Sequence, residues 1–308
     1  MRHSFPQGIV SVLQTPFQAD LSIDETSLVR LIDSAITAGA AGFLAPAVAS
    51  EVGFLSKRER ERLLELIPAA IGGRVPFIAG ASSENAAECA HYGKIGAKCG
   101  AQAWLVAIPE AVYANPSSVL PFVEVAAAAV DLPLVVQDLQ WNGPGLSLKA
   151  IAELAERIPQ LAGIKIETVP AGPKYSQVRA ALGDRVWIAG GWAAPQMIEA
   201  LDRGVDAMIP ESSMVAVYRA VYELHRAGDR RAAIKLFREL LPVLAFANQE
   251  IRLCIGFFKR LLVEKRIFTA AHMRAPFEWD EWNGRIAGEL IGHYMALEEM
   301  LHHSVNQR

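Results

Sequence analysis

Eight short apolar runs constrain the fold of this chain more than any other feature of its sequence. They recur about every 20 to 35 residues, and Gly or Pro bounds most of them. They are continuous rather than alternating in hydrophobicity, which is typical of strands buried on both faces of a parallel sheet. The runs are GIVSVLQTP from Gly8, GFLAPA from Gly42, VPFIAGA from Val75, AWLVAIP from Ala103, LPLVVQD from Leu132, GIKIET from Gly163, VWIAGG from Val186 and DAMIP from Asp206.

Helical patterns separate these runs. Ser22 with Glu25, and Ser56 with Glu59, have the spacing of capping boxes that open helices, and Ser147 is placed to cap another. Eight strands that each precede a helix predict a (β/α)₈ TIM barrel, an α/β fold, over residues 1–228. A doubly wound open sheet is the alternative, but its usual five or six strands fit less well.

After about residue 228 the strand pattern stops. Residues 232–244 and 251–262 have the periodicity of amphipathic helices, and a stripe from Trp282 to Leu301 predicts a third. We therefore expect a C-terminal helical extension over residues 229–308. An aromatic and leucine stripe of this kind is more often a packing surface than a cofactor site, so we assign the extension no chemistry.

The charge and cysteine content exclude several classes of protein. A net charge of −3 without long single-sign blocks argues against binding to nucleic acid or to an anionic membrane surface. Three cysteines without CxxC spacing argue against a disulfide framework and favour the cytoplasm. No secretory signal is recognisable, and the longest apolar tract, residues 119–136, contains two prolines and two acidic residues, so it cannot cross a bilayer. We expect a small neutral or anionic ligand.

Several catalytic motifs are missing from the sequence. The seven histidines form no HxH or HExxH pattern and none lies at a strand end, so no metal site is predicted. GxSxG, GxGxxG and GxxxxGK[ST] do not occur, which removes the usual serine hydrolase, dinucleotide and P-loop interpretations. We predict no cofactor.

Lys165 in the run LAGIKIET is the one basic side chain among the predicted strand ends, where barrel enzymes hold their active sites. Side chains alternate along a strand, so if Ile164 and Ile166 pack under the helices, Lys165 points into the barrel. There, desolvation disfavours the charged ammonium and leaves an amine able to attack a carbonyl. The alternatives are a lysine that reaches outward to solvent and a structural ion pair with Glu167.

Other strand-end residues carry weaker signals. Asp138 and Glu51 are candidates for acid/base catalysis or for helix capping, and Ser50 is a candidate to donate a hydrogen bond to a substrate carboxylate. Gly190 and Gly191 follow the seventh strand, where many barrels bind phosphate, although a tight turn explains the pair equally well. A phosphosugar isomerase that uses this loop is therefore a third hypothesis.

Taken together, five motifs resemble the dihydrodipicolinate synthase and N-acetylneuraminate lyase family of class I aldolases. These are Thr15-Pro16-Phe17 after the first strand, GAAGF at the second, Pro109 after the fourth, GIK on the sixth and Gly190 at the end of the seventh. The resemblance implies a TIM barrel that is usually a tetramer. It also implies that Lys165 forms an imine with a 2-keto acid.

The sequence departs from the family pattern around the predicted site. The GTTGE loop of the family is here Ala47 to Glu51, without threonines, and its strand-five tyrosine is Gln137. Tyr113 keeps the spacing of another family tyrosine, and the arginine of the synthase loop is absent. The motifs VQD, KIET and SE resemble those of the dehydratases of 2-keto-3-deoxy sugar acids in this family.

From this resemblance we expect a Schiff-base lyase that acts on a 2-keto acid, as a dehydratase or aldolase of a 2-keto-3-deoxy sugar acid. Its expected catalytic residues are Lys165, Gln137 and Tyr113. Gly190 is expected to leave room beside the imine, and the base is open among Tyr113, Asp138, Glu167 and a water molecule. Substrate contacts are expected from Ala49, Ser50, Asp138, Gly190 and Ile209. The expected partners are the 2-keto acid and further copies of the chain, as a tetramer or dimer. The alternatives are a synthase-type aldol condensation of pyruvate and a barrel that binds a 2-keto acid without catalysis.

Overall fold

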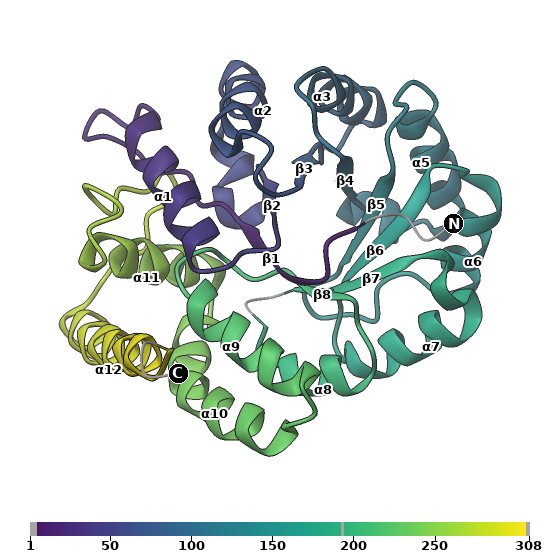
Figure 1. The fold of residues 1–308 in the computed structure, drawn as a ribbon. Helices are drawn as coiled ribbons and strands as arrows, with labels where there is room; N and C mark the ends of the chain where they lie inside the picture. Colours follow the sequence, from purple (N-terminus) through teal and green to yellow (C-terminus); the bar gives the residue numbers. More distant parts are fainter. Residues whose placement is uncertain (1–4, 192–193, 306–308) are drawn as a thin grey trace.

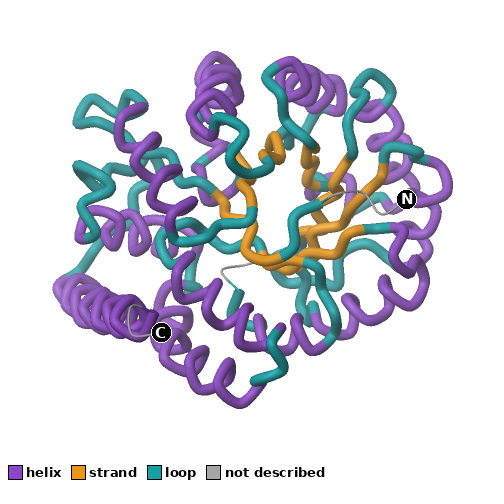
Figure 2. Tube along the Cα trace, viewed as in Figure 1, coloured by secondary structure: helices purple, strands orange, loops and turns teal. Residues whose placement is uncertain are grey.

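The structure, a computed structural model, describes residues 5–191 and 194–305, and its core is a closed barrel of eight parallel strands in sequential order. Figure 2 shows the strands at the centre, ringed by helices. This confirms the predicted TIM barrel. The strands are β1 (Gly8–Val12), β2 (Gly42–Ala45), β3 (Phe77–Gly80), β4 (Ala103–Ala107), β5 (Leu134–Leu139), β6 (Leu161–Glu167), β7 (Trp187–Gly190) and β8 (Ala207–Met208).

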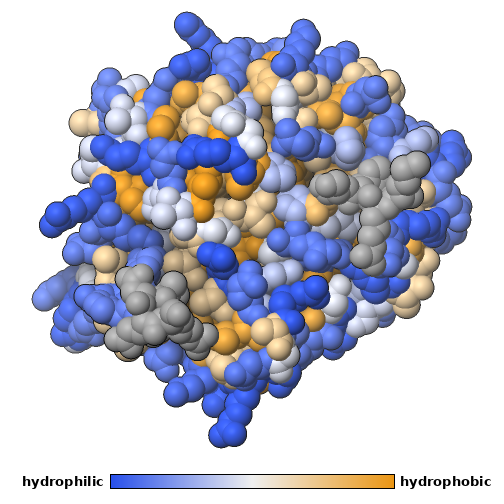
Figure 3. All heavy atoms as spheres, in the orientation of Figure 1, coloured by the Kyte–Doolittle hydropathy of each residue, from blue (hydrophilic) through white to orange (hydrophobic). Residues whose placement is uncertain are grey.

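A helical segment follows each strand and covers the outside of the barrel (Figure 1). The principal ones are α1 (Glu25–Thr37), α2 (Lys57–Ile71), α3 (Ala86–Lys98), α5 (Val119–Ala127), α6 (Leu148–Arg157), α7 (Gly172–Leu182), α8 (Met197–Asp202) and α9 (Val215–Arg226). A short helix, α4 (Glu110–Tyr113), precedes α5, and a 3₁₀ turn, η1 (Val48–Ser50), follows β2. The face shown in Figure 3 is mainly hydrophilic, with apolar atoms visible between the charged side chains.

Helix starts were predicted correctly in two of three places. Ser56 and Glu59 form the reciprocal capping box before α2, and Ser147 caps α6. The box predicted for Ser22 and Glu25 is wrong, because α1 begins at Glu25 and its N-cap is Asp24, whose carboxylate accepts the N–H of Ser27 at 3.0 Å. The hydroxyl of Ser22 donates instead to Asp20 Oδ1 at 2.6 Å.

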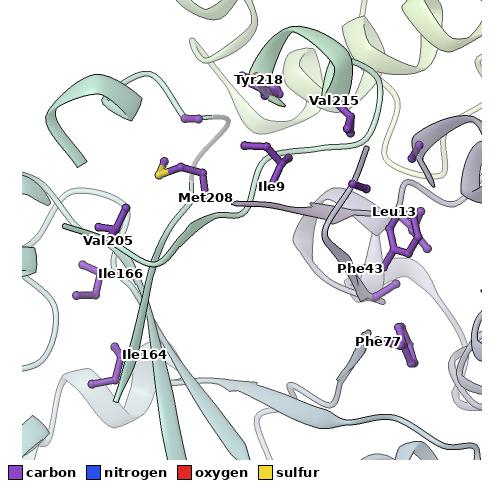
Figure 4. Close-up of a cluster of buried hydrophobic side chains, with 14 of the residues drawn as sticks. Ile9, Leu13, Phe43, Phe77, Ile164, Ile166, Val205, Met208, Val215 and Tyr218 are labelled. Carbon is purple, nitrogen blue, oxygen red and sulfur yellow. The ribbon is translucent and has the colours of Figure 1, made fainter. Parts of the chain in front are cut away.

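The alternation of side chains divides the apolar residues into two layers. Val10, Leu105, Val135 and Ala189 belong to a cluster inside the barrel. Their neighbours along the strands, such as Ile164 and Ile166, belong to the larger layer between strands and helices, and Figure 4 shows these two on the outer side of the barrel wall. Since this interior is packed with side chains, space for a ligand is confined to the strand ends.

Three helices follow the barrel: α10 (Arg230–Ala247), α11 (Ile251–Glu264) and α12 (Glu281–Val305). They lie together on one side of the barrel, where α10 packs against α9 and α12 (Figure 1). Their positions match the helices predicted for the extension. In the part of the chain that the structure describes, no helix is long and apolar enough to cross a membrane.

A buried ion pair joins this extension to the barrel. Lys259 of α11 is fully buried, and its ammonium contacts the carboxylate of Glu51 in the turn after β2. The other oxygen of Glu51 accepts the N–H groups of Arg274 at 2.8 Å and Ala275 at 3.1 Å. Glu51, which the sequence offered as an acid/base or capping candidate, is therefore committed to holding the extension in place.

We expect Lys259→Met to destabilise the protein by about 3–5 kcal/mol at pH 7, because the carboxylate of Glu51 then stays buried without its cation. The variant should also alter the pH dependence of stability. Burial lowers the pKa of Lys259 to about 8 from the ordinary 10.5, so the folded chain releases this proton before the unfolded chain does. The contribution of Lys259 to stability therefore rises as the pH increases from about 8 to 10.5.

Urea unfolding of the wild type and the variant between pH 7 and 10.5 measures both effects. The double variant Glu51→Gln/Lys259→Met is the control, and it should recover part of the loss because no buried charge is left alone. A single variant as stable as the wild type at pH 7 would show that the pair does not hold the extension.

Candidate active site

A cavity opens at the carboxyl ends of the strands, where the (β/α)₈ fold places active sites. Residues from β5, β6 and the segments after β1, β2 and β8 line it, together with residues of the extension. The carboxylate, ammonium and amide side chains on this wall are Gln14, Gln137, Lys165, Glu167, Glu211, Asn248 and Glu250.

Lys165 lies at the centre of a buried polar group in this cavity. Its Nζ is 3.1 Å from Glu167 Oε1, and both side chains are more than nine-tenths buried. The amide of Gln137 donates to the second oxygen of Glu167. Gln137 and Lys165 are register partners on β5 and β6, so the three side chains share one face of two neighbouring strands. Lys165 therefore points into the barrel, as predicted, and it also forms the ion pair with Glu167 that was given as an alternative.

Gly191 provides the space that Glu167 occupies. A Cβ atom at position 191 would lie 2.0 Å from Glu167 Oε1, which is closer than any real contact. The Gly190-Gly191 pair therefore has a role that neither the phosphate nor the turn interpretation anticipated. Because Gly191 has no side chain, it leaves room for the carboxylate of Glu167, which pairs with Lys165.

Gly190 itself does not lie beside Lys165. A Cβ there would meet the hydroxyl of Tyr175 at 2.7 Å and the side chain of Met208 at 2.9 Å, both of which belong to the outer layer. The register explains this placement, because Lys165 pairs with Ala189 and Gly190 is one residue further on, with the opposite orientation. The expectation that Gly190 leaves room beside the imine is wrong.

Tyr113 and Asp138 lie together, but not on the cavity wall. The Tyr113 hydroxyl donates to Asp138 Oδ1 at 2.8 Å, the N–H of Leu146 donates to the same oxygen at 2.9 Å, and Lys174 Nζ is 2.5 Å from Oδ2. Asp138 follows Gln137 on β5 and so faces the other way. Burial and the Asp138 charge raise the pKa of the Tyr113 hydroxyl. This group connects β5 to the surrounding loops and to α7.

The two residues predicted to contact the substrate from the turn after β2, Ala49 and Ser50, differ in their position relative to the cavity. Ala49 lines the cavity, as does Ile209 after β8, whereas Ser50 does not. The Ser50 hydroxyl donates to the carbonyl of Leu13 at 2.5 Å, and its N–H donates to the carbonyl of Ala47 at 2.9 Å. Both donors of Ser50 are therefore used by backbone carbonyls, one in its own turn and one in the segment after β1. Val48 and Ala49 begin η1, and the leading N–H groups of a helical turn have no partner within it.

The extension also lines the cavity, a role that its sequence does not indicate. The contributing residues come from the end of α10, from α11 and from the turn between them. They are Asn248, Glu250, Ile251, Cys254, Ile255 and Phe258. Their helical periodicity indicates burial without saying what the buried face covers, so no local pattern predicts this role. Within residues 5–191 and 194–305, no cluster of three or more His, Cys, Asp or Glu residues could hold a metal ion.

Comparison with known proteins supports the architecture. A sequence model of the dihydrodipicolinate synthetase family matches residues 5–279. The chain is 34% identical to a 4-hydroxy-tetrahydrodipicolinate synthase of Salinibacter ruber over 167 residues, which cover 52% of this chain and 53% of that protein. It is 27% identical to an L-2-keto-3-deoxyarabonate dehydratase of Azospirillum brasilense over 277 residues, 88% of each chain.

Solved structures show the same fold. The 4-hydroxy-tetrahydrodipicolinate synthase from Methylacidiphilum fumariolicum superposes with a TM-score of 0.87. The match covers 97% of this chain and 99% of that one, at 20% sequence identity. At this identity the likeness establishes the barrel and leaves the reaction open.

We expect Gly191→Ala to displace Glu167 from Lys165 and to destabilise the protein by about 1–3 kcal/mol, because the added methyl overlaps the carboxylate. A crystal structure of the variant measures the distance from Lys165 Nζ to Glu167, and urea unfolding measures the stability. Gly53→Ala is the matched control, since a Cβ there meets nothing within 4 Å. An unchanged ion pair in Gly191→Ala would contradict this role.

Proposed function

Because this chain belongs to the dihydrodipicolinate synthetase family, we propose that it binds a 2-keto acid as an imine on Lys165 and removes water from a 2-keto-3-deoxy sugar acid. Members of the family are class I lyases and aldolases, so the chain is an enzyme of that class rather than a binding barrel without catalysis. The observation that carries the proposal is the buried Lys165 with Glu167 3.1 Å from its nitrogen.

Imine formation requires a neutral amine and a way to move protons. Glu167 accepts a proton from Lys165 Nζ, to which it is already paired. The amine then attacks C2 of the keto acid, and Glu167 returns the proton to the hydroxyl of the resulting carbinolamine. That hydroxyl leaves as water, which gives a protonated imine and restores the carboxylate of Glu167. That imine withdraws electrons from C3, so a C3 proton becomes acidic.

The substrate carboxylate fits the turn after β2. Val48 and Ala49 at the start of η1 line the cavity, and the N–H groups that lead a helical turn have no partner within it and are suited to an anion. Ser50 is not required, because both of its donors are used by backbone carbonyls, those of Ala47 and Leu13. Ile209 provides an apolar wall on the same cavity.

Glu167 is the best placed general base. It lies on the cavity beside the imine nitrogen, whereas Tyr113 and Asp138 are bonded to one another away from it. Glu167 takes a C3 proton to give an enamine, and the C4–O bond then breaks as the proton passes to the leaving hydroxyl, which departs as water. Gln137, whose amide holds Glu167, orients the carboxylate, because an amide hydrogen-bonds but does not exchange protons at neutral pH.

A synthase-type condensation of pyruvate with an aldehyde is the second candidate. Several relatives bear the name 4-hydroxy-tetrahydrodipicolinate synthase, and this reaction would begin with the same imine on Lys165. Gln137 in place of the family's strand-five tyrosine and a carboxylate beside the lysine favour the dehydratase. The homo-oligomer and the cytoplasmic location stay predictions.

Borohydride trapping tests the imine. We expect the wild type to form a reduced adduct with pyruvate that mass spectrometry maps to Lys165, and Lys165→Ala to form none. Lys174→Met is the matched control, because Lys174 is a second buried lysine that pairs with Asp138 outside the cavity. An adduct elsewhere, or none in the wild type, would rule out the mechanism.

A pair of substitutions tests the base. We expect Glu167→Gln to keep the pyruvate adduct but to lower kcat for a 2-keto-3-deoxypentonate by about 10²- to 10⁴-fold, the usual size of general base catalysis. Tyr113→Phe should stay within about threefold of the wild type. A large loss in Tyr113→Phe with little change in Glu167→Gln would reverse the assignment. Product analysis separates loss of water from condensation.

A further inference from the structure

Three glycines of α12 have no explanation within a single copy of the chain. Gly284, Gly288 and Gly292 recur at every fourth residue along this 25-residue helix, although glycine is the least favourable helical residue after proline. None of the three has a positive φ. A Cβ atom at any of them would meet nothing within 4 Å in the part of the chain that the structure describes. Neither the backbone conformation nor the packing of one copy therefore requires glycine here.

The glycines belong to an exposed face of α12, which lies at the edge of the molecule (Figure 1). The residues along the middle of this face follow one another by three or four positions and lie within about 40° of one line along the helix. All of them are exposed, and we call them the α12 seam: Glu281, Arg285, Gly288, Gly292, Ala296, Glu299 and His303. The centre of the seam thus consists of small residues, and ionisable side chains lie on either side of it.

The order of the charges indicates which partner fits the α12 seam. Arg285 lies seven residues before Gly292 and Glu299 lies seven residues after it, which is about 10 Å along the helix axis in each direction. When two copies of the helix meet antiparallel at Gly292, Arg285 of each copy faces Glu299 of the other. A parallel pair would instead place each charge against its own kind, which is unfavourable. The charge pattern is therefore complementary to itself in the antiparallel arrangement.

The other residues of this face fit the same arrangement. Gly292 meets its own copy and Gly288 meets Ala296, so the two backbones approach closely without large side chains between them. Trp282 and Met300 lie on one flank of the α12 seam and are 61% and 60% exposed. In the antiparallel pair, Trp282 of each copy lies beside Met300 of the other. Two apolar contacts, one at each end, then remove these side chains from water.

We propose that the α12 seam binds the α12 seam of a second copy of this chain, antiparallel and with the two-fold axis at Gly292. A surface that is complementary to itself is what a two-fold homodimer requires. No residue of α12 lines the cavity that contains Lys165, so this inference does not depend on the proposed function.

Cysteine cross-linking of the full-length chain tests the arrangement. Gly292→Cys places a thiol at the two-fold axis, so mild oxidation should join two chains through the new thiols, and peptide mapping locates the bond. Gly284→Cys is the matched control, because its two copies would lie about 24 Å apart along the helix axes, beyond the reach of a disulfide. No cross-link in Gly292→Cys, or equal cross-linking of the two variants, overturns the proposal.

Charge reversal gives an independent test by sedimentation velocity over a range of protein concentrations. Arg285→Glu and Glu299→Arg should each weaken association by about tenfold or more and halve the mass of the assembly, because like charges then meet at both ends. The double variant Arg285→Glu/Glu299→Arg should restore the mass, since it keeps the complementary pattern. Other contacts between copies leave this result unchanged, because loss of one two-fold interface still halves the assembly. A monomeric wild type, or single variants with the wild-type mass, overturns the proposal.

Discussion

The strict alternation of side chains in a closed parallel barrel is the constraint on which this structure depends. Each strand residue faces either the barrel interior or the surrounding helices, and a charge on either side is costly unless it is paired. Lys165 satisfies this condition because Glu167, two residues along β6, has the same orientation and Gly191 leaves it room. An amine next to a proton acceptor in a site largely shielded from water follows directly from this geometry.

The barrel could be predicted because its signals are local and repeated. Eight apolar runs at near-regular spacing define eight strands, and few folds use so many strands each followed by a helix. Helix starts were less certain, since Ser22 and Asp24 both suit an N-cap and the backbone of the preceding turn decides between them. The extension was recognised as helical, but which face covers the cavity depends on tertiary packing that periodicity does not encode.

The positions of the site residues could be predicted from the sequence only in part. Lys165, Gln137, Ala49 and Ile209 lie on the cavity as expected, whereas Ser50, Tyr113, Asp138 and Gly190 do not. Applying to β5 the alternation used for β6 excludes Asp138, because it follows Gln137. Excluding Gly190 also needs the register between β6 and β7.

The pairing of Glu51 with Lys259 spans 208 residues of sequence, and this separation matters during synthesis. On the ribosome, the turn after β2 emerges long before α11, so its carboxylate must remain hydrated until the lysine is translated. The same turn carries Val48 and Ala49 on the cavity wall. A nascent chain that already has all eight strands therefore still lacks the residues of α11 that complete the cavity wall.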